Sequence, residues 1–334
     1  MEIFERNEPE LIRKMEILFR KKAEKEGQPP RRCAHTVSMG LLKAEFTVEP
    51  DLPADLKVGL FKHPATYRAL IRTSHSRIEG GANKIKDGRG FALKLLGVQG
   101  EKCSRDPLFQ QTQDLLMLSF PTIAIGTIKE FFIFRYYQLK WPVALFFLKT
   151  LIDGRMIKFI RMLRAVHHDT SPLDIRYWSV TPYRYGEQAV KFSIVPTSGF
   201  KSTLPEVLTN DYLIRNMANH LAGHEATFDF MIQFFKDQKS TPIENMGREW
   251  KESDAPFIKV ATLRIPKQDF QTEERYALAE YLSYSPAHAL VEHRPLGGIN
   301  RTRIFVYEQL WKFRMSARKK ERFEATPDLF QSLV

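Results

Sequence analysis

Short apolar runs separated by turn-forming residues decide the fold of this chain. Residues 41–97 read LLKAEFTVEPDLPADLKVGLFKHPATYRALIRTSHSRIEGGANKIKDGRGFALKLLG. The apolar runs are LLKAEFTV, YRALIRTS and GFALKLLG, and they are separated by Pro50, Pro53, Pro64 and several glycines. Runs of this length bounded by proline and glycine are typical of β-strands. The stretch therefore predicts three consecutive strands of a β-meander.

Strand-like runs return later in the chain, between segments with a helical pattern. They are IRYWSVT, AVKFSIV and VATLRI, and FDFMIQFF follows a helical segment at about 211–223. Apolar residues at helical spacing occur in 2–26, 123–166, 273–281 and 301–322. Strands with inserted and appended helices, without a regular βαβ alternation, predict an α+β fold around an antiparallel sheet or barrel.

We expect the chain to be organised in three parts. Residues 1–30 are expected to form an N-terminal helical arm, because two prolines interrupt the helical pattern at its end. Residues 31–268 are expected to form the β-barrel, with helices inserted at about 123–166. Residues 269–334 are expected to form a C-terminal helical segment.

The composition is that of an ordinary globular protein with a large positive charge. Of 334 residues 43% are hydrophobic, and the net charge is +12. This charge suits anionic partners such as phosphate, carboxylate or a membrane surface. No recognised nucleic-acid module is present, so no nucleic-acid partner is expected. Cys33 and Cys103 are too few for a disulfide framework, and the charged N-terminus does not resemble a secretory signal. We therefore expect a cytoplasmic protein.

The most apolar segment, residues 121–166, has two explanations. Lys129, Arg135 and Lys140 are among the residues that interrupt it before any window reaches the roughly 20 apolar residues of a membrane span. Its aromatic residues are interleaved with basic ones, which is typical of helices that lie on a lipid surface, so peripheral membrane contact is one expectation. Packing of these helices against a larger body explains the same pattern.

The segment NRTRIFVYEQLWKFRMSARKK (300–320) predicts an amphipathic helix with candidate residues on one face. Arg303, Tyr307 and Arg314 are four and then seven residues apart, so at about 100° per residue they share a face. An arginine one turn from a tyrosine favours the tyrosine anion, and tyrosinate is a known axial ligand of haem iron. A core tyrosine flanked by solvent-facing arginines has the same spacing, so spacing alone leaves both possibilities open.

Two further candidate sites lie nearer the N-terminus. In PPRRCAHTVSMG, His35 follows Arg32 by three residues, and a histidine over an apolar pocket can transfer protons at neutral pH. In ALIRTSHSR, Arg72 and Ser74 alternate onto one face of a predicted strand, where a serine can orient a histidine and an arginine can hold an anion. A loop histidine and a polar sheet face are the alternatives. A thiolate ligand at Cys33 is less favoured, because no other feature of a thiolate–haem site surrounds it.

The order and content of these segments resemble the haem catalase superfamily. The pattern R-x-x-H comes first, followed by R-x-S, then by D-x-R-G-F-A from Asp87 to Ala92, and finally by R-x-x-x-Y with an arginine seven residues later. The similarity extends from about residue 31 to residue 314. It fits best the short catalase-related branch, which includes fatty-acid hydroperoxide enzymes of the allene oxide synthase type. The resemblance implies a catalase-like antiparallel β-barrel with inserted and C-terminal helices.

The resemblance also implies a haem b (iron) cofactor and a role for each candidate residue. Tyr307 is expected to be the proximal iron ligand, with Arg303 stabilising its anionic form. His35 is expected to be the distal acid–base group, oriented by the hydroxyl of Ser74. Five more residues are expected to contact the haem: Arg32, Arg72 and Arg314 at the propionates, Phe131 as a distal aromatic side chain, and Val37 at the porphyrin.

Two departures from the family affect the expected reaction. Catalases carry a distal asparagine in D-L-V-G-N-N-T-P, whereas this chain has DLLMLSFP, so Leu118 or Ser119 takes that place. Losing a polar partner for peroxide costs on the order of 1–3 kcal/mol, or roughly one to two decades in rate. The allene oxide synthase type has threonine directly before the distal histidine, where this chain has Ala34.

We therefore expect a haem-dependent hydroperoxidase, a catalase-related peroxidase that acts on organic or fatty-acid hydroperoxides in preference to hydrogen peroxide. Two alternatives remain: a fatty-acid hydroperoxide isomerase or lyase, and a non-enzymatic haem-binding protein. A homo-oligomer is expected.

Overall fold

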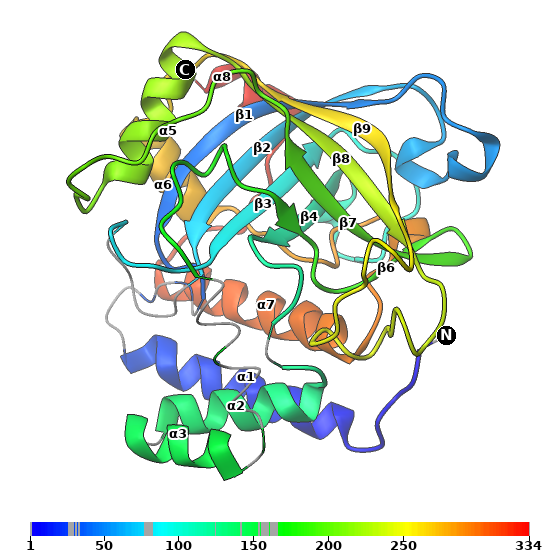
Figure 1. Cartoon of the computed structure of the whole chain (residues 1–334), viewed down its shortest axis with the longest axis vertical. Coiled ribbons are helices and arrows are strands. Elements are labelled where there is room, and N and C mark those ends of the chain that lie inside the picture. Colours follow the sequence, from blue (N-terminus) through cyan, green and yellow to red (C-terminus); the bar gives the residue numbers. More distant parts are fainter. Residues whose placement is uncertain are drawn as a thin grey trace.

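The main feature of the fold is a closed antiparallel β-barrel (Figure 1). The computed structural model describes residues 2–25, 30, 32, 34–76, 83–123, 125–140, 142–152, 154, 160 and 166–333. The strands are β1 (Ser38–Val48), β2 (Thr66–His75), β3 (Arg89–Leu96), β4 (Thr112–Leu118), β5 (Tyr177–Trp178), β6 (Tyr183–Tyr185), β7 (Gln188–Pro196), β8 (Ala226–Phe234) and β9 (Phe257–Ile265). Their order is β5-β4-β3-β2-β1-β9-β8-β7-β6, and an additional pairing of β5 with β7 closes eight strands into a ring.

Helices lie mainly on one side of the barrel. They are α1 (Glu8–Lys25), α2 (Ile128–Lys140), α3 (Val143–Ile152), α5 (Tyr212–Gly223), α6 (Glu273–Tyr281), α7 (Gly298–Ala317) and α8 (Pro327–Ser332). In Figure 1, α7 lies beneath the barrel, and α1, α2 and α3 lie beyond α7. Both α1 and α2 contact α7, whereas α3 contacts α2. None of the described residues belongs to a helix that is long and apolar enough to cross a membrane.

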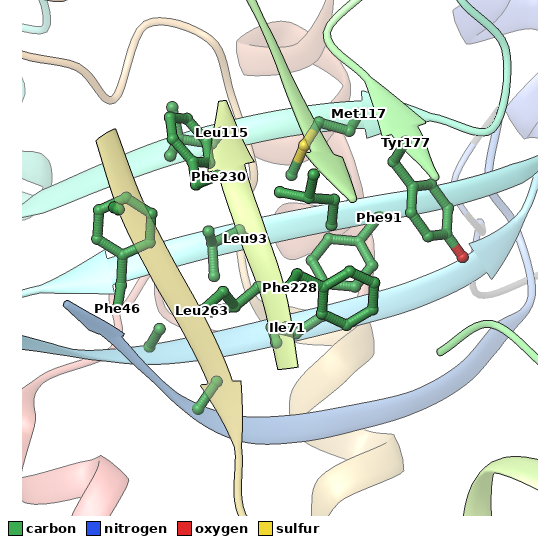
Figure 2. Packing of buried hydrophobic residues seen from close by; sticks show 14 of the residues in the cluster. Phe46, Ile71, Phe91, Leu93, Leu115, Met117, Tyr177, Phe228, Phe230 and Leu263 are labelled. Carbon is green, nitrogen blue, oxygen red and sulfur yellow. The ribbon is translucent and has the colours of Figure 1, made fainter. Parts of the chain in front are cut away.

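Alternation along the strands separates the barrel interior from its outer face. Phe91 and Leu93 of β3 point into the interior, where they meet Phe228 and other large apolar side chains of the opposite wall (Figure 2). Since successive strand residues face opposite sides, Ala92 faces outward. It belongs to a second apolar cluster on the outer face, against which Tyr307 of α7 also packs. The outer face of the barrel is therefore the surface that meets α7.

The predicted α+β fold with an antiparallel β-barrel is confirmed. The helix predicted at 273–281 coincides with α6, and the arm predicted at 2–26 contains α1. Within 123–166 the structure has α2 and α3. Parts of that segment lie outside the described residues, namely 124, 141, 153, 155–159 and 161–165.

The helix predicted at 301–322 is wrong at both ends, because α7 begins earlier and ends earlier. Lys319 adopts φ 52°, and the amide of Lys320 donates to the carbonyl oxygen of Met315. A left-handed residue followed by a backbone hydrogen bond that spans five residues is a motif that ends helices, and glycine usually occupies its left-handed position. A lysine-rich run carries no such signal, so the sequence pattern extended the helix too far.

Candidate functional site

His35 lies immediately before β1, next to the outward-facing residues of β2. Its Nδ1 is 3.0 Å from the Oγ of Ser74, and its carbonyl oxygen accepts a hydrogen bond of 2.8 Å from Nη2 of Arg72. The φ of His35 is 54°, in the left-handed region that is unfavourable for residues other than glycine. The structure thus brings His35 together with the two β2 residues that the sequence singled out.

Gly90 provides the space that the imidazole occupies. A Cβ atom at this position would lie 2.4 Å from Nδ1 of His35 and 2.7 Å from Oγ of Ser74. Across the sheet, Ser74 pairs with Gly90, and Gly90 pairs with Leu118. Residues paired in this way face the same side of the sheet. The aliphatic side chain of Leu118 therefore lies on the same face of the sheet as Ser74, which contacts His35.

Of the two residues predicted for the distal position, only Leu118 faces the side of His35. Ser119 follows β4, and its Oγ accepts a hydrogen bond of 2.9 Å from the backbone amide of Arg89. The amide of Ser119 in turn donates to the carbonyl oxygen of Arg89. The hydroxyl of Ser119 is thus engaged by the neighbouring strand.

The imidazole of His35 is held in its neutral form. Burial, together with the positive charges of Arg72 and Arg303, lowers the pKa of His35 to about 3. Arg32 and Arg135 act in the same direction. In the tautomer whose Nδ1–H donates to Oγ of Ser74, Nε2 is unprotonated and can accept a proton from a ligand.

Arg303 and Tyr307 lie one turn apart on α7. The guanidinium carbon of Arg303 is 5.6 Å from the centre of the Tyr307 ring. Its Nη1 donates to Oγ1 of Thr181 at 3.0 Å and to Oδ1 of Asn300 at 2.9 Å. Burial lowers the pKa of Arg303, but the phenolic groups of Tyr307 and Tyr183 outweigh burial, and the pKa is raised. A fixed positive charge therefore stays beside the phenolic oxygen of Tyr307.

The three arginines predicted to bind propionates converge on the end of α6. Nη2 of Arg32 donates to the carbonyl oxygen of Ala279 at 3.0 Å, and Nη1 of Arg314 donates to that of Glu280 at 2.9 Å. Nη2 of Arg72 lies 3.6 Å from the carboxylate oxygen Oε1 of Glu280. Arg72 and Arg314 are both almost completely buried. The structure thus places these arginines in one cluster.

Positive charge exceeds negative charge in this cluster. Burial lowers the pKa of Arg32 and Arg314, and it lowers the pKa of Arg72 to about 9. Burial alone would raise the pKa of Glu280, but the arginines lower it. Among the described residues, Nε of Arg32, Nε of Arg72, Oε2 of Glu280 and the hydroxyl of Tyr284 are buried without a hydrogen-bond partner. Unpaired buried N–H groups with excess positive charge suit an anionic group.

The remaining predicted residues lie beside this site. Phe131 of α2 and Leu118 pack against the same apolar cluster. One turn further along α2, the guanidinium of Arg135 lies 5.3 Å from the centre of the Phe131 ring, and it interacts electrostatically with Tyr307. Val37 is half-buried between His35 and β1, and its carbonyl oxygen accepts a hydrogen bond from the amide of His75.

These residues fit a haem group. The charge of Arg303 acts on both His35 and Tyr307, so the imidazole and the phenol belong to one site. A phenol beside a guanidinium suits haem iron, and the unpaired arginine N–H groups suit propionates. Elsewhere in the described part of the chain, no group of three His, Cys, Asp or Glu residues could hold a metal ion.

The comparisons with known proteins identify the fold. No protein-family model matches the chain, and no curated protein matches it. Three solved structures are similar to 89–93% of this chain. They are a fungal catalase (TM-score 0.69, 16% identity), a bacterial catalase (0.66, 13%) and catalase A from Saccharomyces cerevisiae (0.69, 16%). The chain spans 63–64% of the length of these proteins. It therefore has the catalase-like fold that its sequence motifs predicted.

Four residues of the site were not predicted from the sequence. Asn300 precedes Arg303 by one helical turn, so helical spacing alone could have identified it. Gly90, Arg135 and Glu280 enter the site only through contacts with distant segments. Cys33, the alternative thiolate ligand, lies outside the described residues.

Proposed function

We propose that the protein is a haem-dependent hydroperoxidase. One observation carries the proposal: the neutral imidazole of His35 and the phenol of Tyr307 share Arg303 as an electrostatic neighbour. The catalase-like fold supports an oxidoreductase that acts on peroxides. The sequence resemblance to short catalase-related proteins supports the same class of enzyme.

In this proposal the outer barrel face and α7 would hold haem b, and Tyr307 would bind its iron as a phenolate. Arg303 would stabilise the negative charge of that phenolate. Arg32, Arg72 and Arg314 would hold the propionates. When bound, haem iron supplies the redox chemistry that cleaves the O–O bond.

His35 moves the proton in this reaction. Since its pKa is lowered to about 3, the imidazole is an unprotonated acceptor at neutral pH. Nε2 takes the proton of the hydroperoxide and returns it to the departing oxygen. Ser74 orients the ring through Nδ1, and Arg72 holds the backbone of His35 through its carbonyl oxygen.

The apolar surroundings favour an organic hydroperoxide as substrate. Leu118 stands where catalases have a polar group, and with Phe131 it packs against one apolar cluster. Neither side chain can hydrogen-bond to peroxide oxygen. We expect a higher kcat/KM for linoleic acid hydroperoxide than for hydrogen peroxide. A clear preference for hydrogen peroxide contradicts this assignment.

The same apolar surroundings also support rearrangement of the substrate as a second candidate function. If the oxygen released by O–O cleavage finds no polar partner, an alkoxyl radical can form an epoxide or break the carbon chain. Product analysis separates the two functions. A peroxidase yields the alcohol and consumes a reductant, whereas an isomerase or lyase yields an epoxide or an aldehyde without one.

Substitutions of the two central residues test the proposal. We expect the wild-type protein to take up hemin with a ferric phenolate absorption spectrum. Y307F should lose that spectrum, whereas Y136F, a change at an exposed tyrosine, should keep it. H35Q should keep haem and lose at least 100-fold in turnover. A wild-type protein that takes up no hemin overturns the proposal, and unchanged turnover in H35Q favours a non-enzymatic haem-binding protein.

A further inference from the structure

The proposed haem chemistry assigns no role to the guanidinium of Arg135. It lies on α2 one turn after Phe131, so the two side chains share a face of the helix. The guanidinium lies 5.3 Å from the ring centre of Phe131 and 5.7 Å from that of Phe134. Its Nη1 donates to Oε1 of Gln138 at 2.7 Å. Its Nε is buried and has no hydrogen-bond partner among the described residues.

This guanidinium lies close to the reacting groups. Its charge acts on the imidazole of His35 and on the phenol of Tyr307. The face of α2 that carries it also carries Phe131, which packs with Val306 of α7 and with the apolar cluster next to Leu118. Arg135 therefore stands at the apolar side of the site.

Among the residues that the structure describes, no carboxylate pairs with Arg135. Arg303 has the phenol of Tyr307, and the arginines around Glu280 have a carboxylate and, in the proposed function, the propionates. Within the same described residues, the phenol of Tyr307 is the group that attracts the charge of Arg135. A cation among aromatic rings with a free buried N–H suits a carboxylate that arrives with an apolar chain.

We propose that Arg135 binds the carboxylate of a fatty-acid hydroperoxide and so selects substrates that carry a free acid group. This inference rests on the proposed function and narrows its substrate class. The apolar chain then lies along Phe131 and Leu118, while the hydroperoxide reaches His35. Substrates without the carboxylate lose this anchor.

The test compares an acid with its ester in three variants of α2. Linoleic acid hydroperoxide and its methyl ester differ only at the carboxylate. We expect the ratio of kcat/KM for the acid to that for the ester to fall about tenfold in R135Q. R135K should restore part of the ratio. K129Q removes an exposed cation from the same helix and should leave the ratio unchanged.

Binding of unreactive linoleate to the haem-loaded protein gives a readout without turnover. Its dissociation constant should rise about tenfold in R135Q and stay unchanged in K129Q. Equal losses for acid and ester, or unchanged linoleate binding in R135Q, overturn the proposal. If the wild-type protein reduces no organic hydroperoxide but binds linoleate through Arg135, the proposed function is wrong and the carboxylate-binding site at Arg135 is still supported.

A second inference rests on the exposed apolar face of α3. Leu145 is 43% exposed, Leu148 51%, Leu151 58% and Ile152 71%. Their spacing of three and four residues places them on one side of the helix. In Figure 1, α3 lies at the lower end of the group of helices beneath the barrel.

We infer that this face of α3 binds an anionic lipid surface. Residues 128–152 contain four Lys and Arg against one Glu, so the segment is attracted to anionic headgroups. Ten residues of helix span about 15 Å, half the thickness of a bilayer core, so α3 lies on the surface. Such a position is typical of amphipathic anchors.

Vesicle co-sedimentation tests this inference. We expect binding to vesicles of equal parts phosphatidylglycerol and phosphatidylcholine, and at least fivefold less bound protein for L148S/I152S. L204S/V207S, which changes exposed apolar residues elsewhere, should bind as the wild type does. Absence of wild-type binding overturns the inference. The inference is also overturned if L148S/I152S changes from dimer to monomer in light scattering while its vesicle binding is unchanged. In that case a second copy of the chain covers this face of α3.

Discussion

The imidazole of His35 is held in position before any ligand arrives. A left-handed backbone at a non-glycine residue costs about 1–3 kcal/mol, and here the carbonyl oxygen of that residue is held by Arg72. Ser74 holds Nδ1, and Gly90 leaves room for the ring. Because the group is positioned in advance, little reorganisation is needed when a substrate binds.

Adding a methyl group at Gly90 should displace the imidazole. In G90A the new Cβ would overlap with Nδ1 of His35 and crowd Oγ of Ser74. We expect a loss of about 1–3 kcal/mol in the free energy of unfolding and a loss of peroxidase turnover with haem retained. Urea denaturation and steady-state kinetics measure the two effects. G199A is the matched control, since a Cβ there meets nothing within 4 Å. Full turnover in G90A would show that the ring position is unimportant.

The sequence predicted the residues that form local motifs in the site, but it did not predict all residues of the site. His35 follows Arg32 by three residues, and Arg72 and Ser74 share a strand. Arg303 and Tyr307 lie one helical turn apart. The local spacing within each of these segments carried the signal. Glu280 joins Arg72 across more than 200 residues. No local pattern encodes such a contact, because it depends on how α6 packs against the barrel.

Among the elements, α1 is tied to α7 by a partly buried ion network. Arg301 of α7 donates from Nε to Glu8 of α1 and from Nη1 to Glu2 at 2.6 Å. Glu244, from the loop after β8, lies 3.4 Å from Nη2 of the same arginine. The side chains of Glu2 and Glu8 are only 7% and 6% exposed, so their charges need compensation. Glu2 also pairs with Arg294, whereas Arg301 is the cation that compensates Glu8 among the described residues.

Removal of the central cation should loosen the N-terminal helix. In R301M, Glu8 is left buried without its cation, whereas Glu2 keeps its ion pair with Arg294. We expect a loss of about 3 kcal/mol in the free energy of unfolding and faster proteolysis within α1. R264M removes an arginine that pairs with two carboxylates on the surface, where all three side chains are nearly half exposed. R264M should lose less than about 1 kcal/mol in the free energy of unfolding. Equal losses in the two variants would contradict a structural role for the network.

Most elements could be predicted because their burial follows their local pattern. β4 could not, since three polar residues begin it: Thr112, Gln113 and Asp114, all buried. Asp114 is compensated by Lys94 at 2.7 Å and by His288 at 2.7 Å, which come from other parts of the chain. β6 and α8 were missed because they are short. Closure of the barrel depends on the β5–β7 pairing, which no local pattern shows.

For the molecule as a whole, buried histidines make stability depend on pH. Burial lowers the pKa of His293 to about 4, and its Nε2 accepts a hydrogen bond of 2.9 Å from the amide of Leu60. In the unfolded chain a histidine has a pKa near 6.5. Between these values the unfolded chain binds a proton that the folded protein does not bind. The free energy of unfolding therefore falls as the pH is lowered from about 6.5 to 4.

Urea denaturation at several pH values measures this contribution. His293 accounts for a slope of up to about 1.4 kcal/mol per pH unit, because the unfolded chain binds one more proton than the folded protein. Protonation of Nε2 would also break the bond from Leu60. In H293Q the titrating group is absent while an amide oxygen can still accept that bond, so the slope between pH 6.5 and 4 should decrease. H63Q removes an exposed histidine and should keep the wild-type slope. His35 contributes in the same direction and remains in both variants, so some slope persists in H293Q. An identical slope in H293Q and the wild type would mean that His293 is already protonated, or solvated, in the folded barrel.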